Sequence, residues 1–225
     1  KHKNLRDMTK PHCGKEAIYA IDLQDFYPSI DSKRVSSFFC NCKCSSRIAE
    51  LLTRLTTFDN QLPQGFPTST ALANLIASKL DYDQLNIAQK CNLSRTRWID
   101  DIVFSGRIKD LECAIHKINS AVLRNGFRMN KEKTNFMRRR NQPAVVGLCI
   151  DKHNPYIPEG LINRVRETIL IAEKYGVDKA KAFYDPAIGN RSLIAHLHGL
   201  IVHIKQFNPV TGLELEQALA RINQT

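Results

Sequence analysis

Two adjacent aspartates, Asp100 and Asp101, interrupt the apolar, strand-forming run TRWIDDIVFS of residues 96–105. Charged side chains are rarely buried unless they are paired or bind a metal, because an ionised carboxylate in a medium of low dielectric constant is very costly. At about 4 Å and an effective dielectric constant of 20, two such charges repel by roughly 4 kcal/mol. The chain must therefore fold so that something offsets this repulsion.

A β-hairpin explains how both carboxylates can face one place. Consecutive residues of a regular strand point to opposite faces, whereas the side chains of a tight turn can converge, and Asp is a favoured turn residue. Residues 98–104 therefore predict a hairpin with the aspartates at its tip. Asp22 follows the strand-like run AIYAI (17–21) and becomes a third carboxylate if the two strands are neighbours. Three converging carboxylates favour Mg²⁺, a hard cation that binds oxygen. A solvated turn without function is the alternative.

The remaining hydrophobic periodicity predicts an α+β fold, in which an antiparallel sheet is backed by helices and followed by a mainly helical region. The expected order is strand, helices, hairpin, helix, strand, helices. The expected elements are a helix from an Asp31 N-cap to about Cys40, a helix over 48–55, a loop over 62–69, a helix with Leu72, Leu75, Ile76 and Leu80, a helix from an Asp110 N-cap to Gly126, a strand over 144–150, a helix ending at Gly176, and helices to the end with breaks at Gly189 and Asn208–Pro209.

Positive charge is concentrated in the first two thirds of the chain. Residues 1–150 hold 24 Lys and Arg against 14 Asp and Glu, whereas residues 151–225 hold 9 against 8. An excess of this size points to a polyanionic partner, most simply nucleic acid. A basic surface that only keeps the protein soluble is the alternative. Charge and composition change together near 151–158, which predicts one domain over 1–154 and a second over 155–225.

The sequence also bears on location and redox state. No stretch approaches 18 consecutive apolar residues, and the start KHKNLRDMTK lacks both an initiator Met and the apolar core of a signal peptide, which suggests a fragment or a processed product. Seven cysteines without a secretory signal favour reduced thiols and a cytoplasmic location. The one-residue gaps of Cys40, Cys42 and Cys44 do not match the usual zinc spacing, so ordinary reduced cysteines are favoured over a structural metal.

Five motifs carry a resemblance to a known family. They are IDLQDFYPSID, LPQGFPTSTALANL, RWIDDIVFS, GFRMNKEKT and VVGLCI, in this order. They resemble successive motifs of the reverse-transcriptase palm, closest to the bacterial retron and retron-like enzymes, and SLIAHLHGLIVHIKQFNPVTGLELEQAL resembles the thumb of that group. The resemblance covers residues 17–221. It implies an RNA-directed DNA polymerase, a nucleotidyltransferase that acts in phage defence, with a palm and a remnant of the fingers over 1–154 and a thumb over 155–225.

The resemblance also implies the roles of individual residues. Asp22, Asp100 and Asp101 would hold two Mg²⁺ ions, for which Mn²⁺ could substitute, about 3.5–4 Å apart. The other implied roles are a catalytic Lys133 beside the leaving pyrophosphate, nucleotide binding by Asp25, Phe26, Tyr27 as the steric gate, Gln64 and Gly65, a primer grip of Val146, Gly147 and Leu148, and backbone phosphate contacts by Arg138, Arg139 and Arg140. Without the family, each of these residues also fits an ordinary core, loop or surface role.

Three departures from the family pattern qualify the resemblance. Trp98 and Ile99 stand where the family usually has Tyr-Ala, and the bulk of Ile99 is expected to affect nucleotide fit or fidelity. VVG replaces the Val-Thr-Gly of many retron enzymes, which favours related defence enzymes. Residues 1–21 are too few for complete fingers, so we expect little or no polymerase activity from this chain alone, with the full gene product or a partner chain supplying them.

The expected partners are an RNA template and primer, the DNA product, dNTPs and a structured non-coding RNA, and no membrane. One rival function is a related enzyme that makes DNA without a template. A second is an RNA-dependent RNA polymerase, whose hairpin normally reads Gly-Asp-Asp and against which Trp98 and Tyr27 argue. A third is a non-catalytic relative that only binds structured RNA, and the three carboxylates with Gln64 argue against it.

Overall fold

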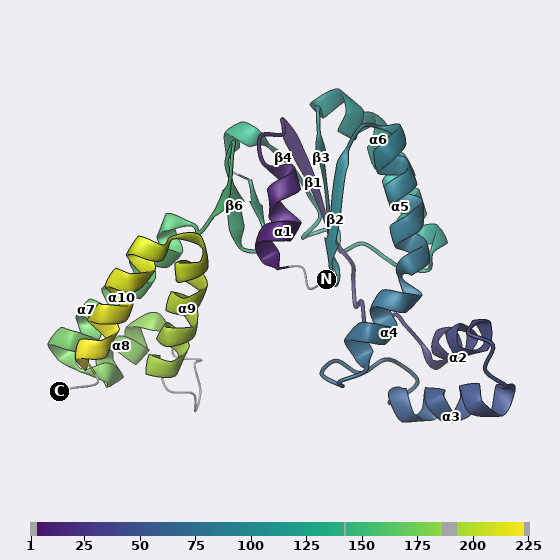
Figure 1. Cartoon of the computed structure of the whole chain (residues 1–225), viewed down its shortest axis with the longest axis horizontal. Helices are drawn as coiled ribbons and strands as arrows, with labels where there is room; N and C mark the ends of the chain where they lie inside the picture. The colour runs from purple at the N-terminus through teal and green to yellow at the C-terminus, as the bar shows by residue number, and fades with distance from the viewer. Residues whose placement is uncertain (1–3, 142, 186–192, 223–225) are drawn as a thin grey trace. The chain divides into compact units, whose positions relative to one another are not determined.

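The computed structural model describes residues 4–141, 143–185 and 193–222. The chain divides into two compact units, Lys1–Val146 and Gly147–Thr225 (Figure 1). This division falls between Val146 and Gly147 rather than between residues 154 and 155, where the sequence places the domain boundary. Val146 and Gly147 have positive φ, 50° and 78°, as expected at the centre of a tight turn.

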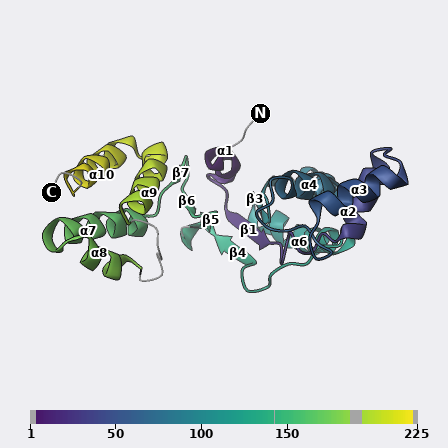
Figure 2. The ribbon, with the colours of Figure 1, turned by 90° about the horizontal axis from the view of Figure 1, so that it is seen from below.

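The first unit is built on a four-stranded antiparallel sheet in the order β2-β3-β1-β4 (Figure 1). Figure 2 shows β1, β3 and β4 of this sheet from below. β1 and β3 pair along their whole length, from Ala17 opposite Gly106 to Asp22 opposite Asp101. The expected first strand is therefore confirmed and extends to Asp22. The strands are β1 (Ala17–Asp22), β2 (Ser94–Trp98), β3 (Asp101–Gly106) and β4 (Asn135–Arg138).

Helices α5 and α6 pack against each other and against this sheet, and their apolar faces form the core with the strands. The side chains of Phe104, Leu111, Ile118 and Phe127 are fully buried there. The helices of this unit are α1 (Leu5–Thr9), η1 (Lys10–His12), α2 (Ser32–Asn41), α3 (Ser46–Thr56), α4 (Ser69–Ile76), α5 (Ser78–Lys90) and α6 (Ile108–Arg124).

The helix boundaries confirm one predicted cap and correct another. Asp31 is the N-cap of α2, where its side chain accepts a hydrogen bond from the Arg34 amide at 2.8 Å. Asp110 is not an N-cap, because α6 begins at Ile108 and Asp110 lies in its first turn, paired with the Arg107 guanidinium at 2.8 Å. An acidic residue in the first turn is favourable there as well, since the helix dipole is positive at this end.

A buried histidine ties the amino-terminal turn to the sheet. His12, at the end of η1, is 1% exposed, and its Nδ1 lies 2.6 Å from the Ser105 hydroxyl while its Nε2 lies 2.7 Å from the Thr96 hydroxyl. Burial, aided by the charge of Lys15, lowers the pKa of His12 to about 4. The imidazole is therefore neutral at pH 7, with one ring nitrogen donating and the other accepting.

The remaining elements follow β4. They are η2 (Arg139–Asn141), β5 (Ala144–Val145), β6 (Leu148–Ile150), β7 (Pro155–Tyr156), α7 (Glu159–Tyr175), α8 (Val177–Tyr184), α9 (Leu193–Phe207) and α10 (Pro209–Ile222). The single strand expected over 144–150 is wrong, because a turn at Val146 and Gly147 divides it. The end at Gly176 and the break before Pro209 are confirmed, and Gly189 lies outside the described residues.

The second unit has its own apolar interior, which α7, α9 and α10 form together. Val165 and Ile169 of α7 are buried in it, as are Leu197 and Ile201 of α9. In the described ranges, no helix has both the length and the apolar character needed to cross a membrane. The α+β fold class expected from the sequence is confirmed by the sheet and helices of the two units.

Candidate active site

The predicted hairpin is confirmed, but its tip lies one residue earlier than expected. Trp98 of β2 pairs with Asp101 of β3, so Ile99 and Asp100 form the two-residue tip and Asp101 already belongs to a strand. Ile99 has a φ of 57°, in the left-handed region that β-branched residues rarely adopt. The tip is therefore locally strained, as is common at functional sites.

The hairpin brings the three predicted carboxylates to one end of the sheet. Asp22 and Asp101 lie opposite each other in the β1–β3 pair, and the Leu23 amide donates a hydrogen bond to the Asp100 carbonyl oxygen at 3.0 Å. Burial, followed by the charges of Asp100 and Asp22, raises the pKa of Asp101 to about 6. The site therefore disfavours its own full ionisation unless positive charge is added.

Lys133 supplies part of that positive charge. Its Nζ lies 3.3 Å from Asp22 Oδ1, with the lysine side chain 67% exposed and the aspartate side chain 16% exposed. Asn130, which sequence reasoning missed, places this lysine: its amide donates to the Asp22 carbonyl oxygen at 2.9 Å, and its side-chain oxygen accepts from the amides of Glu132 and Lys133. The signal was an Asn followed by a polar turn in NKEKT, the pattern of an Asx turn.

A cavity of about 530 Å³ gathers most of the predicted nucleotide-binding residues. Phe26 is only 3% exposed and its ring packs against Tyr27 and Phe127, so its backbone rather than its ring is available to a ligand. The Tyr27 hydroxyl lies 3.0 Å from the Thr70 hydroxyl of α4. The predicted residues that line the cavity are Asp22, Asp25, Phe26, Tyr27, Gln64, Asp100 and Lys133.

A second cavity of about 200 Å³ lies beside the first. Asp101, Lys133 and Val146 line it, so Val146 of the predicted primer grip shares this cavity with one of the three carboxylates. Leu148 is fully buried and acts as a core residue. Some predicted site residues line neither cavity: Gly65, Gly147 and the exposed Arg138, Arg139 and Arg140.

The donor set at the end of the sheet fits a hard divalent cation. In the described part of the chain, no three His, Cys, Asp or Glu side chains are arranged as a ready-made metal cage, and this covers Cys40, Cys42 and Cys44 as well. Mg²⁺ does not need such a cage, since it is usually held by one or two carboxylates together with substrate phosphates. The neighbouring carboxylates Asp22 and Asp101, with their mutual repulsion, match that requirement.

Comparison with known sequences identifies relatives of this chain among reverse transcriptases. A family model described as "Reverse transcriptase (RNA-dependent DNA polymerase)" matches residues 2–156. The retron Ec86 reverse transcriptase of Escherichia coli is 34% identical over 170 residues, covering 75% of this chain and 53% of that protein. The retron Mx65 reverse transcriptase of Myxococcus xanthus is 26% identical over 241 residues, covering 97% and 52%. The chain thus spans about half the length of these curated relatives.

Two solved structures are similar in fold. A telomerase from Candida tropicalis matches with a TM-score of 0.51 at 14% identity, covering 63% of this chain and 35% of that one. A telomerase from Candida albicans, solved with a fragment of telomeric RNA, matches with a TM-score of 0.53 at 10% identity, covering 94% and 48%. At these identities the likeness concerns the fold, and it agrees with the α+β polymerase architecture expected from the sequence.

Proposed function

Because the chain belongs to the reverse transcriptase (RNA-dependent DNA polymerase) family and its curated relatives are retron enzymes, we propose that it catalyses the addition of dNTPs to a primer on an RNA template. One observation carries this proposal: a single cavity collects Asp22 and Asp100 with Tyr27, Gln64 and Lys133. A protein that only bound RNA would gain nothing from crowded carboxylates that resist ionisation.

The proposed chemistry assigns a task to each side of the cavity. Asp22, Asp100 and Asp101 would hold two Mg²⁺ ions, or Mn²⁺. When bound, such ions lower the pKa of the primer 3′-hydroxyl and balance the charge that develops on pyrophosphate. Lys133, beside Asp22, would place its ammonium against the departing pyrophosphate and provide a proton to it. Catalysis is then mainly positioning and electrostatics.

Substrate orientation falls to the other residues of the two cavities. The Tyr27 ring would lie against the sugar, Gln64 would contact the incoming nucleotide beside Gly65, and the backbone of Asp25 and Phe26 would face the triphosphate. Val146 lines the second cavity with Asp101, which fits a primer end held by the turn at Val146 and Gly147 with Leu148 anchored in the core. A primer 3′-hydroxyl held there lies next to the carboxylates.

The wider proposal concerns partners. The exposed side chains of Arg138, Arg139 and Arg140 suit backbone phosphates of a template–primer duplex. Residues 155–225 would act as the thumb, and fingers from the rest of the gene product or from a partner chain would complete the enzyme. A structured non-coding RNA would be bound, and the retron likeness leads us to propose a cytoplasmic role in defence against phage.

Template-directed synthesis is the first test. Given Mg²⁺, a primed RNA template and dNTPs, the full gene product that contains this chain, with any partner chain that supplies the fingers, is expected to extend the primer in template order, and to extend it poorly with NTPs. Primer-extension gels with omitted templates and single omitted dNTPs measure both properties. Products that form equally without template would favour the untemplated DNA synthesis of a related defence enzyme, and no product under any condition would overturn the proposal.

Sugar discrimination is the second test. Replacing Tyr27 with Ala is expected to raise the relative use of NTPs roughly 10- to 100-fold, because removing the ring opens the space for a 2′-hydroxyl. A difference of about 1.4–2.7 kcal/mol corresponds to that range. The ratio of kcat/KM for dNTP and NTP measures it. Thr70→Val is the matched control, since it removes the hydroxyl partner of Tyr27 and leaves the ring in place. An unchanged ratio in Tyr27→Ala would contradict the gate assignment.

A further inference from the structure

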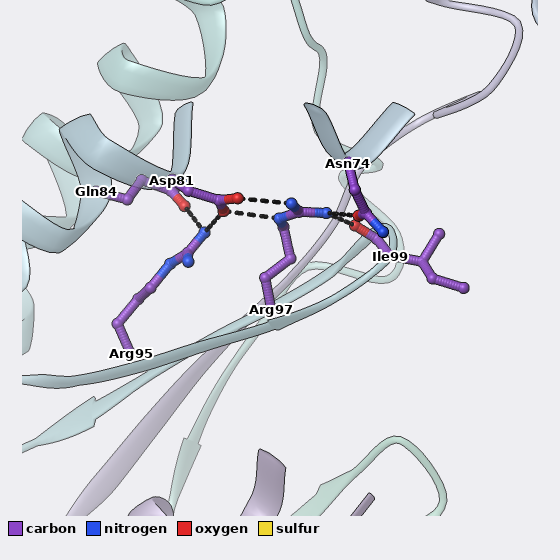
Figure 3. A network of polar contacts seen from close by, with 6 residues as sticks. All are labelled: Asn74, Asp81, Gln84, Arg95, Arg97 and Ile99. Carbon is purple, nitrogen blue, oxygen red and sulfur yellow. Dashed lines mark hydrogen bonds and ion pairs between the residues drawn. The ribbon is translucent and has the colours of Figure 1, made fainter. Parts of the chain in front are cut away.

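The strained hairpin tip is held by an arginine from its own strand. Arg97, in β2, donates from Nη1 to the carbonyl oxygen of Ile99 at 2.7 Å (Figure 3). That carbonyl belongs to the peptide that joins Ile99 to Asp100, so the bond acts directly on the link between the left-handed residue and the first carboxylate. A hydrogen bond from a charged donor is stronger than a neutral one.

The same guanidinium is fixed from the other side by two helices. Its Nε and Nη2 donate to the two carboxylate oxygens of Asp81 in α5, at 2.7 and 2.6 Å, and Nη1 also donates to the Asn74 side-chain oxygen in α4 at 2.9 Å. The Arg97 side chain is only 8% exposed. A bidentate, largely buried pair of this kind has one geometry, so Arg97 transmits the position of α4 and α5 to the tip.

Helix α4 also contacts the proposed sugar gate. Thr70, whose hydroxyl meets that of Tyr27, and Asn74, which meets Arg97, are four residues apart and so lie on the same face of α4, one turn from each other. One short, rigid element therefore touches the ring that would face the sugar and the arginine that holds the hairpin tip. Through these contacts α4 links Tyr27 with Ile99, and both of these residues line the 530 Å³ cavity.

We propose that Arg97 is a positioning residue: it holds the Ile99 peptide in its left-handed conformation and thereby keeps Asp100 and Asp101 directed at Asp22. The inference rests on the proposed function for its activity readout and deepens it by naming what places the catalytic carboxylates. The physical reason is that a β-branched residue leaves the left-handed region unless its surroundings over-determine it. Arg97 is the group that contacts this peptide oxygen and is itself held at both ends.

Arg95 provides a matched control within the same network. It lies two residues earlier on the same face of β2, its side chain is 6% exposed, and it shares the carboxylate of Asp81. Its side-chain hydrogen bonds go to Asp81 and to Gln84 at 2.8 Å, not to the hairpin tip (Figure 3). Replacing either arginine with Lys thus disturbs a similar buried ion pair. Of the two substitutions, only that of Arg97 also removes the hydrogen bond to the Ile99 carbonyl oxygen.

The activity experiment compares the two substitutions in the intact protein. In single-nucleotide addition, Arg97→Lys is expected to lower kcat roughly 100-fold, the scale of a displacement of about 1 Å, with KM for dNTP changed less than about threefold. Arg95→Lys is expected to keep kcat within about threefold of the wild-type value. Its midpoint of urea denaturation should be similar to that of Arg97→Lys, so the two variants are compared at equal stability. In the Ile99→Gly background the loss caused by Arg97→Lys is expected to shrink to less than tenfold, because glycine adopts positive φ without strain.

A second readout does not depend on activity. The Leu23 amide donates to the Asp100 carbonyl oxygen, so its hydrogen exchange reports whether the tip keeps its place beside β1. Arg97→Lys is expected to speed this exchange at least tenfold, and Arg95→Lys to leave it within about threefold. Equal effects of the two substitutions on exchange would overturn the inference. A wild-type protein that fails to extend primers would overturn the proposed function instead, while the exchange result would still decide the role of Arg97.

Discussion

Replacing Asp101 with Asn is expected to lower the rate of primer extension roughly 1000-fold while leaving the metal-free protein at least as stable as the wild type. The activity falls because a carboxylate that holds a catalytic cation supplies several kcal/mol of transition-state stabilisation, and about 1.4 kcal/mol corresponds to a factor of ten. Stability does not fall, because Asp101 is crowded by Asp100 and Asp22 and its pKa is raised to about 6. A neutral amide of the same shape removes that repulsion.

The gain in the free energy of unfolding is expected to be at most about 1 kcal/mol at pH 7, since the carboxylate of Asp101 is only partly buried and is still screened by solvent. Urea denaturation in the presence of a chelator measures it, beside single-turnover extension with Mg²⁺. Asp178→Asn, at an exposed position in the first turn of α8, is the control and should leave the rate of extension unchanged. A variant that loses activity and stability together would show that Asp101 is a structural residue, contrary to its assignment.

Acidification is expected to destabilise the protein through His12 by about 3 kcal/mol between pH 6.5 and pH 4. The unfolded imidazole takes up a proton near pH 6.5, whereas burial lowers the pKa of the folded imidazole to about 4. The unfolded state therefore binds more protons throughout this window, so the free energy of unfolding falls as the pH falls. The contribution of His12 is fully present above about pH 6.5 and is lost as the pH approaches 4.

Urea midpoints of the wild type and His12→Gln between pH 7 and pH 4 measure this effect. The variant keeps a donor and an acceptor for Ser105 and Thr96 but does not titrate, so its stability should depend less steeply on pH. His116→Gln, at an exposed position on α6, should retain the wild-type slope. Identical slopes for the wild type and His12→Gln would contradict the assignment of a buried neutral imidazole.

The elements that the sequence predicted well are those whose signals are local. Alternation and apolar runs indicated β1 and the β2–β3 hairpin, and the caps at Asp31 and Gly176 marked helix ends through chemistry that acts within a few residues. The proximity of Asp22 to the hairpin followed from strand pairing alone. The family resemblance named Tyr27, Gln64 and Lys133 as site residues, and in the structure all three line one cavity.

What could not be predicted depends on contacts between distant segments or on backbone geometry. The sequence around Asp110 fits an N-cap as well as a residue of the first helical turn. The turn inside 144–150 places the β-branched Val146 at positive φ, which such residues disfavour. The same holds for Ile99. The contact of Arg97 with Asp81 and Asn74 joins residues far apart in the chain, so its partners were invisible in the sequence.

Lys133 lines both cavities and pairs with Asp22, and this has a consequence for the order in which ligands bind. On the proposed chemistry, the ammonium and a divalent cation compete for the same carboxylate oxygen, whereas a triphosphate draws the ammonium away from it. Each of the two ligands then strengthens the binding of the other, and by thermodynamic reciprocity it does so by the same factor. On the proposed chemistry, the lysine would act as an internal counter-ion that lowers the affinity of the resting protein for a bare cation and raises it when the nucleotide is bound.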